Sequence, residues 1–92
     1  MNAPRASAEV LSDAASAARC GNVYTTDHAR RRMDERNVSM RDVLTALRSA
    51  TQARYDDERA TWKLTGGQDV DGDGLDVVIK TPTPGVVVVT VF

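Results

Sequence analysis

Apolar residues in the first fifth of the chain recur three or four positions apart, as on one face of an α-helix. The residues in this pattern are Val10, Leu11, Ala14 and Ala18. Ser7 is a suitable N-cap, and Gly21 followed by Asn22 is typical of a helix end. The sequence therefore predicts a first helix between Ser7 and Gly21.

A second helix is expected between Thr26 and Arg36. Thr26 or Asp27 can cap its start, and Asn37 suits the left-handed residue that ends a helix. Two apolar side chains four positions apart then share one face, which can pack on a sheet; these are Ala29 and Met33.

Ser39 opens a third predicted helix, because Asp42 three residues later completes an S-x-x-D variant of the capping box. The helix carries an unambiguous apolar stripe at helical spacing. The stripe consists of Met40, Val43, Leu44 and Leu47.

After residue 50 the pattern changes to strand-like runs. Four strands are expected, at residues 51–55, 60–65, 75–81 and 86–92. The acidic turn 56–58 joins the first two, and the Pro- and Gly-containing turn 82–85 joins the last two. The last strand is rich in Val on both faces, as a central strand would be.

Helices followed by strands indicate an α+β fold. We expect two or three N-terminal helices packed on one face of a roughly four-stranded antiparallel meander. With 92 residues, the chain has room for a single domain, with residues 1–7 flexible.

The apolar runs are too short for a membrane span, since the longest, Val86–Val89, is far below the roughly 20 residues that a bilayer requires. The first residues lack the apolar stretch of a secretory signal, so a cytoplasmic location is expected. One cysteine, Cys20, excludes an internal disulfide, and one histidine, His28, excludes a multi-histidine metal site. No metal and no cofactor is therefore predicted, and Cys20 is expected to be a small buried residue.

Charge is nearly balanced, with 12 basic and 13 acidic residues, which excludes a uniformly basic nucleic-acid binder. The two signs are nevertheless segregated along the chain. Six arginines against four acids lie between residues 24 and 50, whereas residues 66–76 hold four aspartates and no basic residue. A polar molecule with one positive face is allowed, although genome composition would also explain the arginines.

The segment from Asp69 to Gly74 resembles the start of a calcium loop, with carboxylates at positions 1, 3 and 5 and glycine at position 6. Position 12 is Lys80, where the cation requires a carboxylate, and the residues that follow the loop are predicted to form a strand. A Gly- and Asp-rich hairpin turn therefore explains the segment better.

The predicted second helix carries the residues best suited to chemistry. His28, Arg32 and Arg36 are four positions apart and form one polar ridge. His28 lies in the first turn, where the helix dipole favours a neutral imidazole that can act as a general base. The arginines would hold a phosphate and stabilise a charged transition state. The alternative is a histidine at a polar edge of the core and arginines on a solvated helix face.

Two further groups of residues could take part. Lys80 and Thr90 lie on neighbouring predicted strands and could complete a phosphate pocket, although a lysine at a strand end more often protects an edge. Tyr55 and Trp62 could stack on a base, although a single tryptophan in a small domain is more often in the core.

The combined motifs resemble a small bacterial family described only as a domain of unknown function. The first motif is Thr26-x-His28-Ala29-Arg30-x-Arg32-Met33-x-Glu35-Arg36-x-Val38-Ser39, followed by Asp42-Val43-Leu44 and Ala46-Leu47. The second half adds Trp62-Lys63-Leu64, Gly67-x-Asp69-x-Asp71-Gly72, Leu75-x-Val77-Val78 and Val88-Val89-Thr90-Val91-Phe92. The resemblance covers roughly residues 8–92.

This resemblance implies a toxin-like domain related in fold to the RelE, BrnT and MqsR ribonuclease toxins, and thus RelE- or barnase-like. Such toxins cleave RNA without a metal, and members of the resembled family are often encoded beside a zinc-finger antitoxin of the MqsA or YgiT kind. The family positions fall on His28, Arg32, Arg36 and Thr90. Lys80 is a candidate on position alone. The neighbouring Arg30 and Arg31 are expected to contact RNA.

Two hypotheses follow. In the first, the chain is a metal-independent endoribonuclease toxin of a type II toxin–antitoxin pair, with RNA and the antitoxin as partners. In the second, it is a non-catalytic protein-interaction domain on the same scaffold, which binds or regulates a partner protein. Either hypothesis leaves a homodimer through an edge strand open.

Overall fold

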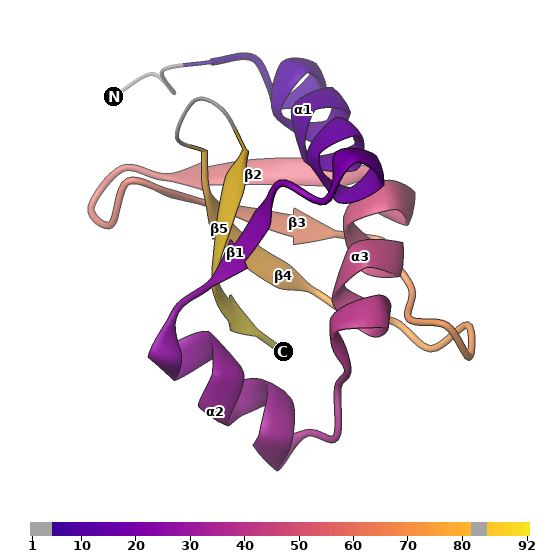
Figure 1. Ribbon diagram of the computed structural model, residues 1–92. Helices are drawn as coiled ribbons and strands as arrows, with labels where there is room; N and C mark the ends of the chain where they lie inside the picture. Colours follow the sequence, from indigo (N-terminus) through magenta and orange to yellow (C-terminus); the bar gives the residue numbers. More distant parts are fainter. Residues whose placement is uncertain (1–4, 82–84) are drawn as a thin grey trace.

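The computed structural model describes residues 5–81 and 85–92 of the chain and has the predicted α+β class (Figure 1). The helices are α1 (Ser7–Cys20), α2 (Asp27–Glu35) and α3 (Met40–Ser49). The strands are β1 (Val23–Thr25), β2 (Gln52–Asp56), β3 (Thr61–Thr65), β4 (Val77–Lys80) and β5 (Val86–Val91).

The five strands form one mixed sheet in the order β1-β5-β4-β3-β2. The three pairings from β2 to β5 are antiparallel, as expected. The prediction of a four-stranded, wholly antiparallel sheet is wrong, because β1 adds a fifth strand that runs parallel to β5. Three residues between two helices are too few to show an alternating pattern, and their partners lie about sixty positions away in the chain.

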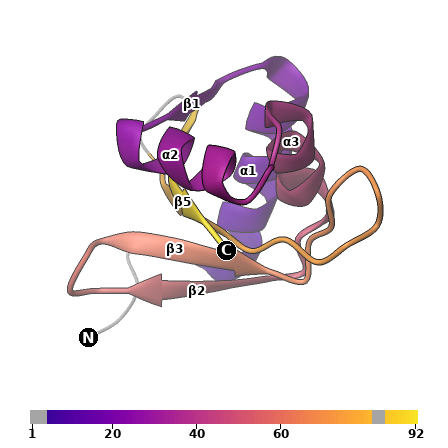
Figure 2. The same ribbon diagram turned by 90° about the horizontal axis from the view of Figure 1, so that it is seen from below.

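Helices α1 and α3 pack together over one face of the sheet, and α2 lies apart from them against β5 (Figure 2). Buried side chains of the sheet and of all three helices form one apolar cluster. Its fully buried large members are Leu47, Leu64, Ile79, Val10, Val43, Val77, Val86, Val88 and Val91. α1 packs on α3 and β2, and α2 packs on β5 through Ala29 and Met33. The opposite face of the sheet is left uncovered by the described helices.

Most predicted helix ends are confirmed. Gly21 and Asn37 take left-handed conformations, with φ of 77° and 56°. Thr26 caps α2 by accepting a hydrogen bond from the backbone N–H of Ala29. Ser39 and Asp42 form the predicted capping box of α3.

Four local predictions are wrong. The N-cap of α1 is Ala6, and the Oγ of Ser7 instead donates a hydrogen bond to the carbonyl of Ala53. Ala60 belongs to the hairpin turn with φ of 54°, so β3 begins one residue later. The strand predicted from residue 75 begins at residue 77. Cys20 is exposed at the end of α1.

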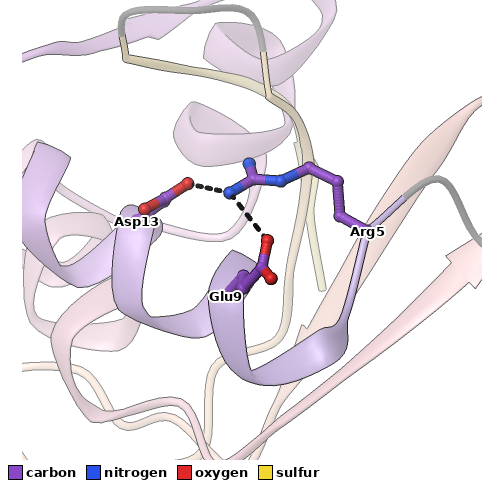
Figure 3. Close-up of polar contacts among 3 residues, drawn as sticks. All are labelled: Arg5, Glu9 and Asp13. Atoms are coloured by element: carbon purple, nitrogen blue, oxygen red, sulfur yellow. Dashed lines mark hydrogen bonds and ion pairs between the residues drawn. The ribbon is translucent and has the colours of Figure 1, made fainter.

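The start of α1 is held by the arginine that precedes it (Figure 3). The guanidinium of Arg5 donates a hydrogen bond to Asp13 and lies 3.7 Å from Glu9. The bond to Asp13 raises the pKa of Arg5. Two predictions fall partly on residues that the structure does not describe. They are the flexible segment 1–7, of which residues 1–4 are not described, and the turn 82–85, of which residues 82–84 are not described.

The loop that resembles a calcium site is closed by its own hydrogen bonds. The Oδ1 atom of Asp69 accepts the backbone N–H groups of Asp71 and Asp73 at 2.9 and 3.0 Å. No cluster of three metal-ligating side chains occurs within residues 5–81 and 85–92. The loop therefore has the structure of the predicted hairpin turn.

Asp42 joins this loop to α3. Its carboxylate accepts the backbone N–H of Ser39 at 2.9 Å and that of Val70 at 3.1 Å. These two donors, Ser39 first, lower the pKa of Asp42. Since the ionised form is the one stabilised in the fold, this contribution is complete above the unfolded pKa and is lost as the pH falls.

We therefore expect Asp42→Asn to lower the free energy of unfolding near neutral pH. The difference from the wild type should shrink as the pH falls below about 4, because the wild type then loses its own carboxylate. Urea unfolding of both proteins over a pH series measures this difference. Asp71→Asn is the matched control, because Asp71 is an exposed acid in the loop that Asp42 binds. A difference that stays constant with pH would contradict the role assigned to the charge.

Candidate functional site

The uncovered face of the sheet carries most of the polar side chains of the strands. Alternation along each strand places Arg54, Lys63 and Lys80 on the side opposite the buried residues. The register aligns Arg54 with Lys63, Lys63 with Val78, and Val78 with Thr90. One row of side chains thus crosses four strands of the sheet from β2 to β5.

A β-bulge in β5 connects this row to α2. Ile79 pairs with Val88 and Val78 pairs with Thr90, so Val89 is an extra residue in β5. Thr26 binds the strand at this point, since its N–H donates to the carbonyl of Val88 at 3.1 Å and its Oγ1 to that of Val89 at 3.2 Å. Because the same Oγ1 caps α2, the first turn of the helix is fixed at the bulge.

The bulge, the first turn of α2 and the hairpin between β2 and β3 surround a depression of about 750 Å³, which we call the sheet hollow. Its polar lining includes His28, Tyr55, Thr61 and Thr90. Its apolar lining consists of Val78, Val89 and Phe92. The side chain of His28 is exposed and therefore open to a ligand entering from solvent.

Two cations face each other across the strands at this depression. Arg54 of β2 and Lys63 of β3 are directly opposed, and both line the sheet hollow. Like charges in opposed positions destabilise a sheet, and an anion bound near both cations would offset this repulsion. The ammonium of Lys63 also lies 4.7 Å from the ring centroid of Phe92, a ring that is 46% exposed.

The other end of the sheet hollow is acidic. Asp56, Asp57 and Glu58 of the hairpin turn line it together with Arg59. Asp56 is engaged in the turn itself, because its Oδ1 accepts the N–H groups of Glu58 and Arg59 at 3.1 and 3.3 Å. The depression is thus polarised, with cations toward the centre of the sheet and carboxylates at the hairpin.

Three of the residues predicted from sequence are brought together in the sheet hollow: His28, Thr90 and Tyr55. Tyr55 also packs on Trp62, with ring centroids 5.1 Å apart. Trp62 itself is only 2% exposed, so its ring belongs to the core and has no open face for a base.

The remaining predicted residues lie elsewhere. Arg32, one turn after His28, pairs with Glu35 at 3.3 Å and does not line the sheet hollow. Arg36 is the C-cap of α2, about 12 Å along the helix from His28. Lys80 lies on the same face as Lys63 but outside the lining. Arg30 and Arg31 are exposed on α2, where Arg30 donates to the Oγ1 of Thr25.

Arg54, Lys63 and Phe92 were not identified as site residues from sequence. The signal was present, because pairing the two strands predicted around the turn at 56–58 aligns a basic residue of each on one face. Phe92 offered no such signal, since its position over Lys63 depends on the bulge in β5.

None of the helices in the described part of the chain has the length and apolar content needed to cross a bilayer. A family model described as "Domain of unknown function (DUF4258)" matches residues 25–92. The chain belongs to this family. The DUF4258 match contains every residue that lines the sheet hollow, and it begins later than the expected residue 8, leaving α1 outside. No curated protein and no solved structure matches the chain.

Proposed function

We propose that this DUF4258 domain binds RNA in the sheet hollow and cleaves it without a metal. The observation that carries the proposal is the convergence of one imidazole, from His28, and one opposed cation pair, Arg54 and Lys63, on a single depression. A general base and two cations that line one depression supply the groups needed for transfer at a phosphodiester.

The chemistry follows from these groups. With the phosphate between the two cations, the imidazole of His28 takes the proton of the adjacent ribose 2′-hydroxyl. The 2′ oxygen then bonds to phosphorus, and the bond from phosphorus to the 5′ oxygen breaks. The products are a 2′,3′-cyclic phosphate and a 5′-hydroxyl, whose proton comes from solvent in this open site. Arg54 and Lys63 stabilise the charge that accumulates on the phosphate oxygens.

The proposal includes the role of toxin in a type II toxin–antitoxin pair, acting on cytoplasmic RNA. It is supported by the motif on α2, which resembles that of a small bacterial family expected to be related in fold to RelE-like toxins, and by a basic sheet face that the described helices leave open. Expression with and without the neighbouring reading frame tests this part, since growth arrest relieved by the neighbour is expected.

The cleavage itself is tested with RNA in EDTA, comparing Lys63→Ala with Lys80→Ala. Both lysines are exposed on the same face, but only Lys63 lines the sheet hollow. Lys63→Ala should lower kcat/KM by about tenfold to a hundredfold, less than the loss of a buried donor, because water partly replaces it. Lys80→Ala should cleave as the wild type does.

Equal losses in the two variants would show that only the general charge of the face matters. If folded wild type cleaves neither free RNA nor RNA on ribosomes, the proposal is wrong and the protein-interaction domain becomes the better hypothesis.

A further inference from the structure

A second depression lies beside the sheet hollow, at the edge strand β2. It has a volume of about 550 Å³, within the range of small-ligand sites, and we call it the edge hollow. Arg54 and Lys63 line both depressions. The cation pair therefore forms the boundary between them and is open to a ligand from either side.

The rest of the edge hollow is uncharged and rich in hydrogen-bonding groups. Hydroxyl and amide side chains are contributed by Ser7, Thr51, Gln52 and Thr65, and Leu11 and Ala53 form its apolar part. The Oγ1 of Thr65 donates to the Oε1 of Gln52 at 3.4 Å, a long bond that leaves the amide group of Gln52 free to donate. Such groups bind phosphate and sugar oxygens, and none of them repels an anion.

The two ends of the sheet hollow differ in the charge of the side chains that a bound polyanion would approach. At the hairpin end the carboxylates of Asp57 and Glu58 repel a second phosphate. At the opposite end the strand passes over Arg54 and Lys63 and reaches the neutral donors of the edge hollow. Electrostatics therefore favours one direction for an RNA strand whose phosphate occupies the sheet hollow, from the cation pair toward the edge hollow.

From this arrangement we infer that the edge hollow is a second phosphate-binding subsite for the same nucleic-acid strand. The inference rests on the proposed function, because it takes RNA as the ligand of the sheet hollow. The bound strand runs across β3 and β2 toward the start of α1. A substrate with one phosphate at the cation pair and a second in the edge hollow then binds better than one with a single phosphate.

The two glutamines of the chain provide a matched test. Gln52→Glu adds a carboxylate inside the edge hollow, and Gln68→Glu adds one at an exposed loop position outside both depressions. Cleavage of a dinucleotide and of a hexanucleotide is measured for each variant. Gln52→Glu should raise KM for the hexanucleotide by about fivefold, the effect of one screened like charge, and change dinucleotide cleavage less, because a dinucleotide places no phosphate in the edge hollow. Gln68→Glu should change neither.

Binding of the labelled hexanucleotide, followed by fluorescence anisotropy at low salt, separates this inference from the proposed chemistry. If the wild type binds without cleaving, the proposed reaction fails, while a loss of binding in Gln52→Glu alone still supports the subsite. Equal effects of the two substitutions, or no binding by the wild type, would overturn the inference.

Discussion

Replacing His28 by alanine should lower RNA cleavage by about 10²- to 10⁴-fold, the usual contribution of a positioned general base. His28 is exposed and lies outside the apolar cluster, so the variant should fold like the wild type. Thr26, not His28, caps α2 and holds it to the bulge of β5. The measurement is kcat for a defined RNA in EDTA, with circular dichroism and thermal unfolding as the check on folding.

Arg32→Ala is the control that separates two assignments of the phosphate clamp. The helical pattern places Arg32 on one ridge with His28, whereas the fold pairs Arg32 with Glu35 and places Arg54 and Lys63 in the depression that His28 also lines. Loss of cleavage in His28→Ala with full activity in Arg32→Ala supports the sheet cations. Equal losses of cleavage in His28→Ala and Arg32→Ala would assign the phosphate clamp to α2. Full activity in His28→Ala would show that the imidazole takes no part in the reaction.

The parts of the fold that were predictable are those specified by neighbouring residues. The capping box of Ser39 and Asp42, the cap at Thr26 and the left-handed ends at Gly21 and Asn37 each depend on a few consecutive positions. The same holds for the apolar faces of α2 and α3. Such signals are visible in a sequence because the backbone groups they satisfy lie within one turn.

The parts that were missed depend on contacts between distant positions. β1 exists only because β5 offers a parallel partner, and its three residues carry no periodic signal. The extra residue at Val89 is set by how β5 pairs with β4, and it determines which side chains stand beside His28. Three residues named from sequence, His28, Tyr55 and Thr90, therefore lie in one depression, while the two cations that also line it required the register of the sheet.

A single methyl group added at Gly67 should destabilise the fold by about 1–3 kcal/mol, the range for overpacked interiors. Gly67 is buried at the end of β3, against the last turn of α3. A Cβ there would lie 2.5 Å from the carbonyl oxygen of Ala46, which accepts the N–H of Ala50 at 2.9 Å. Backbone cannot rotate away as a side chain does, so α3 or β3 must shift.

Gly74→Ala is the matched control for this prediction. A Cβ at Gly74 meets no atom within 4 Å, and both glycines lie in the segment that follows β3. Because alanine restricts the unfolded chain, Gly74→Ala should leave stability unchanged or raise it by a few tenths of a kcal/mol, about the lower limit of this effect. Urea unfolding of the two variants gives both values. Similar stabilities would mean that α3 and β3 adjust to the added methyl group, and the close packing of Gly67 on α3 would then not be a determinant of the fold.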